Sequence, residues 1–235
     1  MLKPSHISFR VNCIQDAYKT FSECGFTVQW GSNPQKAHNA IIWFDEGPFI
    51  ELFQFPRIFR PIHYVLRWTK GKGAGDRWRS WSDAKEGWCD LALEPIEKSL
   101  QYNLKAIRSK LIAQNIECSK IVHGKRVRPD GQSVRYQVLA PLPNTLPFIV
   151  SAYDPPQRPQ KTKHKNGAIR ISQICTKIKK SDFSKFNFLS AKDPLIQPIP
   201  SSESKIQKVV IEGLKVNENA ENFINKINLH SLTKS

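Results

Sequence analysis

The chain has 235 residues, of which 40% are hydrophobic and 10% aromatic, enough for one sizeable core or two small domains. Its formal net charge of +16 indicates anionic partners and does not bear on the fold. Five scattered cysteines without a C-x-x-C pair argue against a disulfide scaffold and a structural zinc site. Because no signal core or membrane-spanning apolar run occurs, we expect a reduced, cytoplasmic protein with no membrane partner.

The first part of the chain predicts one helix and four strands in the order βαβββ. Apolar residues alternate at positions 7, 9 and 11, which indicates a strand that His6 opens. A helical stripe starts at Ile14, and Gly25 is placed to end that helix. Further strands are predicted at 26–30, 40–44 and 49–55, with a polar loop at 31–39. This order is too compact for a doubly wound parallel sheet.

The strand at 49–55 carries one residue that does not suit a buried strand. Glu51 lies between Ile50 and Leu52, and burying an unpaired carboxylate is costly. The side chain therefore either lies on the solvated face of an alternating strand or points inward for a functional reason. Periodicity alone favours the solvated face.

Residues 57–86 interrupt the pattern of strands. Arginines and lysines alternate there with aromatic residues around the sequence Gly71-Lys72-Gly73-Ala74-Gly75, which lacks the spacing of a phosphate-binding loop. We interpret this segment as a long basic and aromatic loop or lid with a glycine tip. Binding of nucleic acid by stacking and phosphate contacts is the alternative. It is less favoured, since no known nucleic-acid-binding signature is present.

The βαβββ order then repeats. A strand at 88–93 is followed by a helical stripe that ends near Asn115, and by strands at 116–122, 134–140 and 147–153. The sequences Pro48-Phe49-Ile50 and Pro147-Phe148-Ile149 open the fourth strand of each unit, which supports an internal repeat.

The remaining sequence predicts a third, incomplete unit packed on the first two. A linker rich in proline and lysine precedes strands at 168–178 and 206–211 and a short helix at 219–227. So little apolar sequence would be marginal as an independent domain. The predicted division is a first unit at 1–56, the loop or lid at 57–86, a second unit at 87–154, and the linker with the C-terminal unit at 155–235.

These features resemble the vicinal oxygen chelate superfamily, and within it the glyoxalase-like domain proteins of the glyoxalase, bleomycin resistance and dioxygenase type. Besides the paired units, His6 and the sequence PFIELFQF, three short stretches carry the resemblance over most of residues 5–178: 37–40, 126–131 and 164–168. The resemblance implies an α+β fold in which paired βαβββ units form curved sheets around a cleft.

The resemblance also implies a divalent metal (Fe, Mn, Ni or Zn) bound in that cleft. His6 and Glu51 occupy the two ligand positions of the first unit, and Glu51 is the candidate catalytic residue. In the second unit Val150 matches Glu51 and cannot ligate a metal. The strand-one position falls at about Cys89 or Asp90, so Asp90 is the candidate third ligand if it points inward.

Four residues are candidates for substrate binding. Arg126, Arg128 and Arg135 would hold a carboxylate or phosphate by bidentate hydrogen bonds if they line the cleft, and Asn39 would contact the ligand. The alternative for the arginines is solvation of a strand, with Arg128 paired to Asp130 in the turn.

The predicted function is binding of a small oxygen-rich or anionic metabolite, with metal-dependent lyase, isomerase or dioxygenase chemistry if the protein is an enzyme. A metal-free protein that sequesters a small molecule is the alternative, and nucleic-acid binding through the basic surface is a further one. A homodimer is left open.

Overall fold

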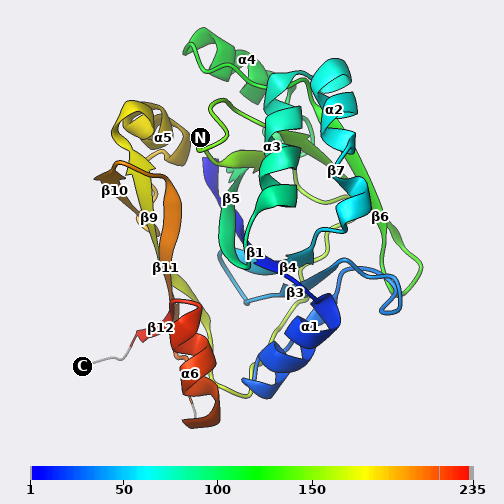
Figure 1. Cartoon of the computed structure of the whole chain (residues 1–235), viewed down its shortest axis with the longest axis vertical. Helices are drawn as coiled ribbons and strands as arrows, with labels where there is room; N and C mark the ends of the chain where they lie inside the picture. The colour runs from blue at the N-terminus through cyan, green and yellow to red at the C-terminus, as the bar shows by residue number, and fades with distance from the viewer. Residues whose placement is uncertain (1, 217, 233–235) are drawn as a thin grey trace.

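The computed structural model describes residues 2–216 and 218–232, which form two β-sheets with helices around them (Figure 1). The larger sheet has eight strands in this part of the chain, in the order β2-β3-β4-β1-β5-β8-β7-β6. Its strands are β1 (Leu2–Val11), β2 (Gln29–Trp30), β3 (Asn39–Ile42), β4 (Phe49–Gln54), β5 (Gly87–Pro95), β6 (Val122–Val127), β7 (Ser133–Leu139) and β8 (Phe148–Val150).

The larger sheet consists of two matching units. β1 pairs in parallel with β4, β5 pairs in parallel with β8, and the two first strands pair antiparallel at the centre. The helices of the units are α1 (Ile14–Glu23) and α4 (Lys105–Ala113). The predicted α+β class with paired βαβββ units is therefore confirmed, although β2 and β8 are shorter than the sequence predicts and the strand expected at 116–122 lies instead at 122–127.

Alternation along the strands assigns the two faces of this sheet. Ile7, Phe9, Ile50 and Leu52 belong to the main core, into which α1 and α4 also bury apolar residues such as Phe21. The residues between them, which include positions 6, 8, 51 and 53, point to the opposite, inner face. The inner face is where the cavity described below lies.

The C-terminal unit is more complete than predicted. Its four-stranded sheet has the order β10-β9-β11-β12 within the described residues. The elements are β9 (Arg170–Lys179), η3 (Lys180–Asp182), α5 (Phe183–Ser190), β10 (Ile196–Ser201), β11 (Lys205–Glu212), α6 (Glu218–Lys226) and β12 (Leu229–Leu232). Pro198 and Pro200 lie in β10, which is tolerated because β10 is an edge strand. The apolar residues of this unit share the main core, so the small sheet covers the back of the large one.

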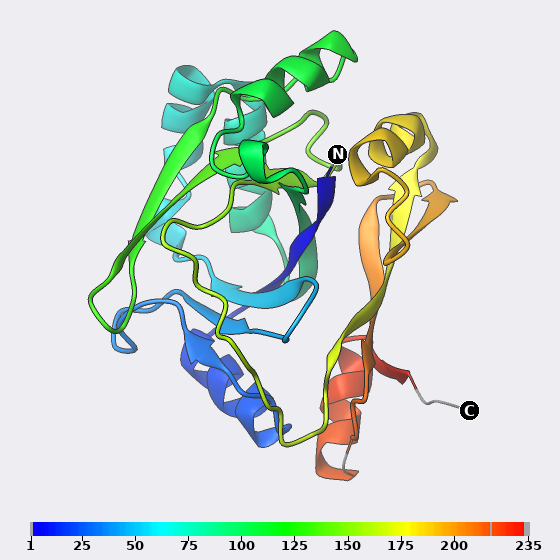
Figure 2. The same cartoon turned by 180° about the vertical axis from the view of Figure 1, so that it is seen from behind.

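The linker to the C-terminal unit is fastened to the first unit (Figure 2). Buried His164 accepts a hydrogen bond from the Thr27 amide at 2.9 Å through Nδ1, and its Nε2 lies 2.9 Å from the Trp43 carbonyl oxygen. Asn166 donates to the Cys24 carbonyl at 2.8 Å. The stretch 164–168 therefore has a structural role.

Residues 57–83 are largely helical, so the prediction of a loop at 57–86 is wrong. The segment contains η1 (Arg57–Phe59), α2 (Ile62–Lys70) and α3 (Lys72–Asp83). Its glycines permit close packing: a Cβ on Gly73 would lie 2.3 Å from the Ala140 carbonyl oxygen, and one on Gly75 would lie 2.5 Å from the Arg67 Cβ. Glycine here reflects tight contacts between elements, a property that the local sequence does not reveal.

No helix in the described part of the chain combines the length and the apolar character needed to cross a bilayer.

Candidate functional site

A cavity of about 600 Å³ lies between the inner face of the large sheet and the helices at 57–83. Most of its lining is apolar or aromatic, which suits a small organic ligand. The aromatic side chains that line it are Phe53, Phe55, Phe59, Trp78, Trp81, Tyr136, Phe148 and Tyr153.

Three polar side chains of the first unit meet on the cavity wall. The Nε2 atom of His6 lies 3.5 Å from Oε2 of Glu51, and Asn39 donates a hydrogen bond to Oε1 of Glu51 at 2.8 Å. They converge because β4 lies between β1 and β3, so that alternate residues of the three strands face the same side. Glu51 therefore faces the cavity, with 26% of its side chain exposed, rather than bulk solvent on an outer face.

His6 is held in an apolar environment. Its ring stacks on Phe49 at 4.7 Å and meets the edge of Phe148 at 5.4 Å. Burial lowers the pKa of His6 and outweighs the nearby charge of Glu51, which raises it. The imidazole is therefore neutral at neutral pH, with Nε2 directed at the Glu51 carboxylate.

Two tyrosines of the second unit complete the polar part of the wall. Burial raises the pKa of Tyr136 and that of Tyr153, and the charge of Glu51 adds to both shifts. Both phenols stay protonated at neutral pH and can donate a hydrogen bond. The sequence does not single these tyrosines out, and the available signals are the alternation of β7 and the position of Tyr153 just beyond β8.

Of the three candidate arginines, the structure brings only Arg126 to the cavity. Its Nη1 donates to the Gly31 carbonyl at 2.6 Å, its Nη2 contacts Gln157, and its guanidinium lies 5.9 Å from the Tyr153 ring. Arg126 is therefore a cation held in a fixed position at the cavity wall.

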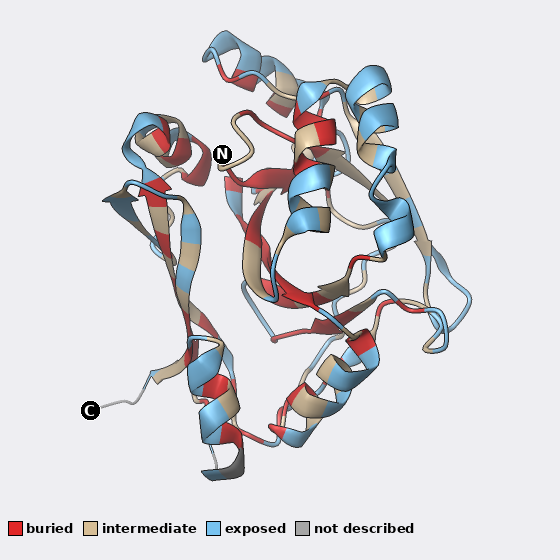
Figure 3. Cartoon of the chain, viewed as in Figure 1, coloured by how far each residue is buried: buried red, intermediate tan, exposed pale blue. Residues whose placement is uncertain are grey.

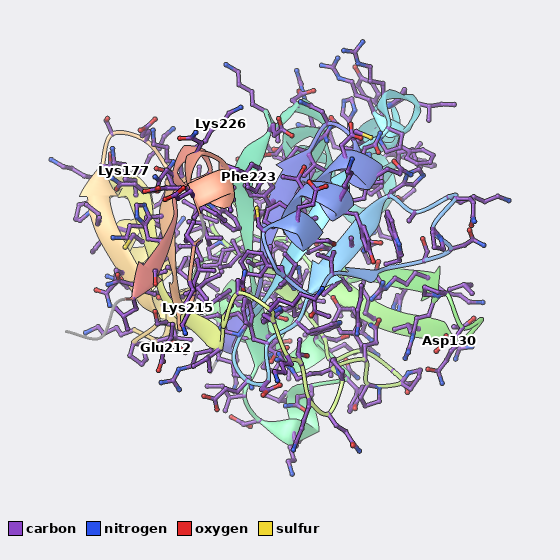
Figure 4. All side chains as sticks on the ribbon, turned by 90° about the horizontal axis from the view of Figure 1, so that it is seen from below. Asp130, Lys177, Glu212, Lys215, Phe223 and Lys226 are labelled. Carbon is purple, nitrogen blue, oxygen red and sulfur yellow. The ribbon has the colours of Figure 1, made fainter. Side chains whose placement is uncertain are left out.

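Arg128 and Arg135 do not line the cavity, contrary to expectation. Arg128 lies beyond the end of β6 and pairs with Asp130 at 2.9 Å. Figure 4 shows Asp130 far out on the β6–β7 hairpin. Arg135 is exposed because it alternates with Val134 and Tyr136, which take the inner face of β7.

The expectation that Asp90 supplies a metal ligand is not met. Both of its oxygens lie 2.8 Å from Nη1 of buried Arg77, and the indole of Trp81 donates to Oδ2 at 2.6 Å. The carboxylate therefore fastens α3 to β5. The sequence could not show this, because the partner comes from a segment that was interpreted as a loop.

Strand register identifies the true counterparts of the first unit's polar residues. His6 pairs with Phe49 across β1 and β4, and Ala92 pairs with Phe148 across β5 and β8. The counterpart of His6 is thus Ala92 rather than Cys89 or Asp90, and the counterpart of Glu51 is Val150.

The donor set does not fit a permanently bound metal ion. Ala92 and Val150 cannot ligate, and no cluster of three or more His, Cys, Asp or Glu side chains able to hold a metal occurs among the described residues. His6 and Glu51 alone would leave most coordination positions to other molecules.

Comparison with known proteins agrees with this architecture. The family model described as "Glyoxalase-like domain" matches residues 5–186. No curated protein matches the sequence. A hypothetical protein from Staphylococcus aureus has a similar structure, with a TM-score of 0.64 and 15% identity, covering 91% of this chain and 92% of that chain.

A Mn(II)-bound glyoxalase from Novosphingobium aromaticivorans is also similar, with a TM-score of 0.51 and 11% identity. The similarity covers 90% of this chain and 66% of the glyoxalase chain. At these identities the two structures support the fold alone.

Proposed function

Because this chain belongs to the glyoxalase-like domain family of the vicinal oxygen chelate superfamily, we propose that its cavity binds a small amphiphilic metabolite and presents it to Glu51. The observation that carries the proposal is the cluster of His6, Asn39 and Glu51 on the wall of an otherwise largely apolar cavity. Polar groups placed sparsely in an apolar cavity fix the orientation of a ligand.

The lining suggests how the ligand lies. Its apolar body would contact the aromatic residues supplied by the helices at 57–83, such as Trp78 and Trp81. A hydroxyl or another hydrogen-bond donor would face the carboxylate of Glu51, which would repel an anionic group placed beside it. An anionic end of the ligand would instead lie near Arg126 and Lys125, which are on the β6 side of the cavity.

Glu51 is the proposed catalytic residue if the ligand is transformed. The Asn39 amide holds one carboxylate oxygen, and the other faces neutral His6, so the carboxylate is fixed and able to accept a proton. A proton acceptor in an apolar cavity suits isomerase or lyase chemistry at a carbon beside a carbonyl group.

A second candidate is a reversibly bound divalent metal, which the two donors His6 and Glu51 would hold. It is favoured by their 3.5 Å separation, at the two positions where the resemblance implies metal ligands. The metal would supply Lewis-acid chemistry, and oxygen atoms of the ligand would have to complete its coordination. Metal analysis of wild type, His6→Ala and Glu51→Ala tests this candidate. Metal content that is equal in all three proteins would exclude it.

A binding screen with protein treated with a chelator tests the main proposal. Small hydroxy and keto acids with an apolar body would be screened by thermal shift, and hits would be measured by calorimetry. We expect Glu51→Gln to weaken binding roughly tenfold or more, because a hydrogen bond to a charged group is lost. The control is Glu23→Gln, on the exposed surface of α1. Equal affinity of wild type and Glu51→Gln for every hit would overturn the proposal.

A further inference from the structure

Helix α2 and the turn before it carry large apolar side chains that are open to solvent. Trp68 is 86% exposed, Ile58 80%, Tyr64 69% and Val65 59%. We call these four residues the α2 patch. Isolated exposed apolar residues are ordinary, but neighbouring ones on a single short segment indicate an interaction surface.

Helical spacing separates the α2 patch from the cavity. Ile62 and Leu66, four residues apart, line the cavity, and Arg67 faces α3, where it pairs with Asp76 at 2.6 Å. Tyr64, Val65 and Trp68 fall on the remaining side of the helix. Figure 3 shows α2 as exposed along most of its length, on the outside of the molecule.

The surroundings of the α2 patch are strongly basic. Residues 57–83 contain seven lysines and arginines against two aspartates, and six of the seven cations remain toward the surface because Arg77 is buried against Asp90. Asp76 pairs with Arg67 and Lys72, and Asp83 pairs with Arg60 and Arg79, so each carboxylate faces more than one cation. The segment therefore presents an excess of positive charge around an apolar centre.

We propose that the α2 patch docks on an anionic phospholipid membrane surface. Trp68, Tyr64 and the aliphatic side chains would enter the headgroup region, where amphipathic aromatic rings are favoured. Basic residues of the same segment, such as Arg57 and Lys70, would contact lipid phosphates and carboxylates. The sequence prediction of no membrane partner was based on the absence of a spanning segment, and that absence does not bear on surface docking.

Charge and side-chain type favour a lipid surface over other occupants. A second copy of this chain would bring two basic segments together, which is unfavourable. Nucleic acid would satisfy the basic and aromatic residues, but stacking on bases uses planar rings and leaves Ile58 and Val65 without a role. An anionic bilayer surface accommodates the basic, the aromatic and the aliphatic side chains of the segment together.

Vesicle sedimentation of the full chain tests the proposal. We expect binding to vesicles of phosphatidylcholine with phosphatidylserine, none to phosphatidylcholine alone, and weaker binding as ionic strength rises. Val65→Ser combined with Trp68→Ser should reduce affinity roughly tenfold or more. Neither residue lines the cavity, so ligand binding should be unchanged.

A matched pair of charge reversals separates local from overall charge. Arg57→Glu with Lys70→Glu should reduce affinity by at least about fivefold for each side chain. Lys105→Glu with Lys110→Glu changes the net charge equally on α4 and should have a smaller effect. Melting temperatures of all variants, measured alongside, would show whether each is folded.

Three results would overturn the proposal. The first is equal binding to both vesicle types, or equal binding by wild type and the α2 variants. The second is a dimer, detected by light scattering without lipid, that the α2 variants abolish. The third is salt-dependent binding of single-stranded RNA that the same variants abolish while vesicle binding persists.

Discussion

The two βαβββ units place different side chains at equivalent positions of the same sheet. His6, Asn39 and Glu51 in the first unit correspond by strand register to Ala92, Tyr136 and Val150 in the second. The first unit therefore supplies a carboxylate with two polar neighbours, whereas the second unit has aliphatic residues at two of these positions and the phenol of Tyr136 at the third. A duplicated fold can thus hold a reactive group with one half and the body of a ligand with the other.

The acidic residues of the two units differ in a related way. Glu51 is partly exposed and faces the cavity, whereas Asp90 is buried and held by Arg77 and Trp81. A carboxylate available to a ligand must retain free hydrogen-bonding capacity, and a carboxylate used for stability must not.

The largest expected effect is on stability at Asp90. Asp90→Ala leaves the buried Arg77 guanidinium without its counter-charge and should reduce the free energy of unfolding by about 3–5 kcal/mol. Glu51→Ala, which removes a partly exposed carboxylate, should cost far less. Urea denaturation of both variants measures the difference. Similar losses would contradict the division of roles between the two carboxylates.

The second prediction concerns a substitution that makes the cavity wall of the second unit more like that of the first. Val150→Glu adds a carboxylate to the cavity wall at the position that matches Glu51. A group that only supports a metal ligand contributes roughly 10–100-fold to metal affinity. A third direct ligand should therefore raise the affinity for Mn²⁺ or Zn²⁺ by more than that. Calorimetry measures the affinity. Val122→Glu, on β6 in the same cavity, is the control for added charge. An equal gain in metal affinity in both variants would contradict the equivalence of Val150 and Glu51 that the strand register indicates.

The third prediction concerns the hydrogen bond that fixes Glu51. Asn39→Ala should weaken binding of ligands found by the screen about tenfold, since a hydrogen bond to a charged group is lost. Tyr136→Phe alters the counterpart in the second unit and should have a smaller effect. A larger loss of ligand affinity in Tyr136→Phe than in Asn39→Ala would show that the second unit contributes more to ligand binding than the first.

The smallest expected effect is on the pH dependence of stability. The pKa of His6 is lower in the folded protein than its ordinary value of 6.5, because the ring is buried. Below about pH 6.5 the unfolded chain takes up this proton more readily than the folded one, so stability falls as the pH falls. His6→Gln should reduce that fall in melting temperature. An unchanged slope would mean that His6 does not titrate differently on folding.

The element order of the larger sheet was predictable because it depends on local periodicity. The repeat of Pro-Phe-Ile at the start of the last strand of each unit marks matching elements, and the register of β4 and β8 keeps Phe49 and Phe148 equivalent. The inward orientation of Glu51 was not predictable from alternation, which defines two faces without saying which one encloses a cavity.

Residues 57–86 were misinterpreted for a related reason. Glycines in a basic and aromatic sequence suggest a loop, whereas Gly73 and Gly75 lie where backbones approach too closely for a side chain. This error also affected the prediction of the site. With Arg77 assigned to a loop, Asp90 had no predicted partner and could be assigned as a metal ligand.

The sequence by itself determined the repeated βαβββ pattern, the residue types at the polar cluster and the basic character of 57–83, since these follow from periodicity and composition. Only the tertiary structure decided which strand positions are equivalent, that Ala92 rather than Asp90 faces His6 across β1 and β5, and which acidic side chain remains free. Those outcomes depend on pairing register and on contacts between distant segments, which no local pattern specifies.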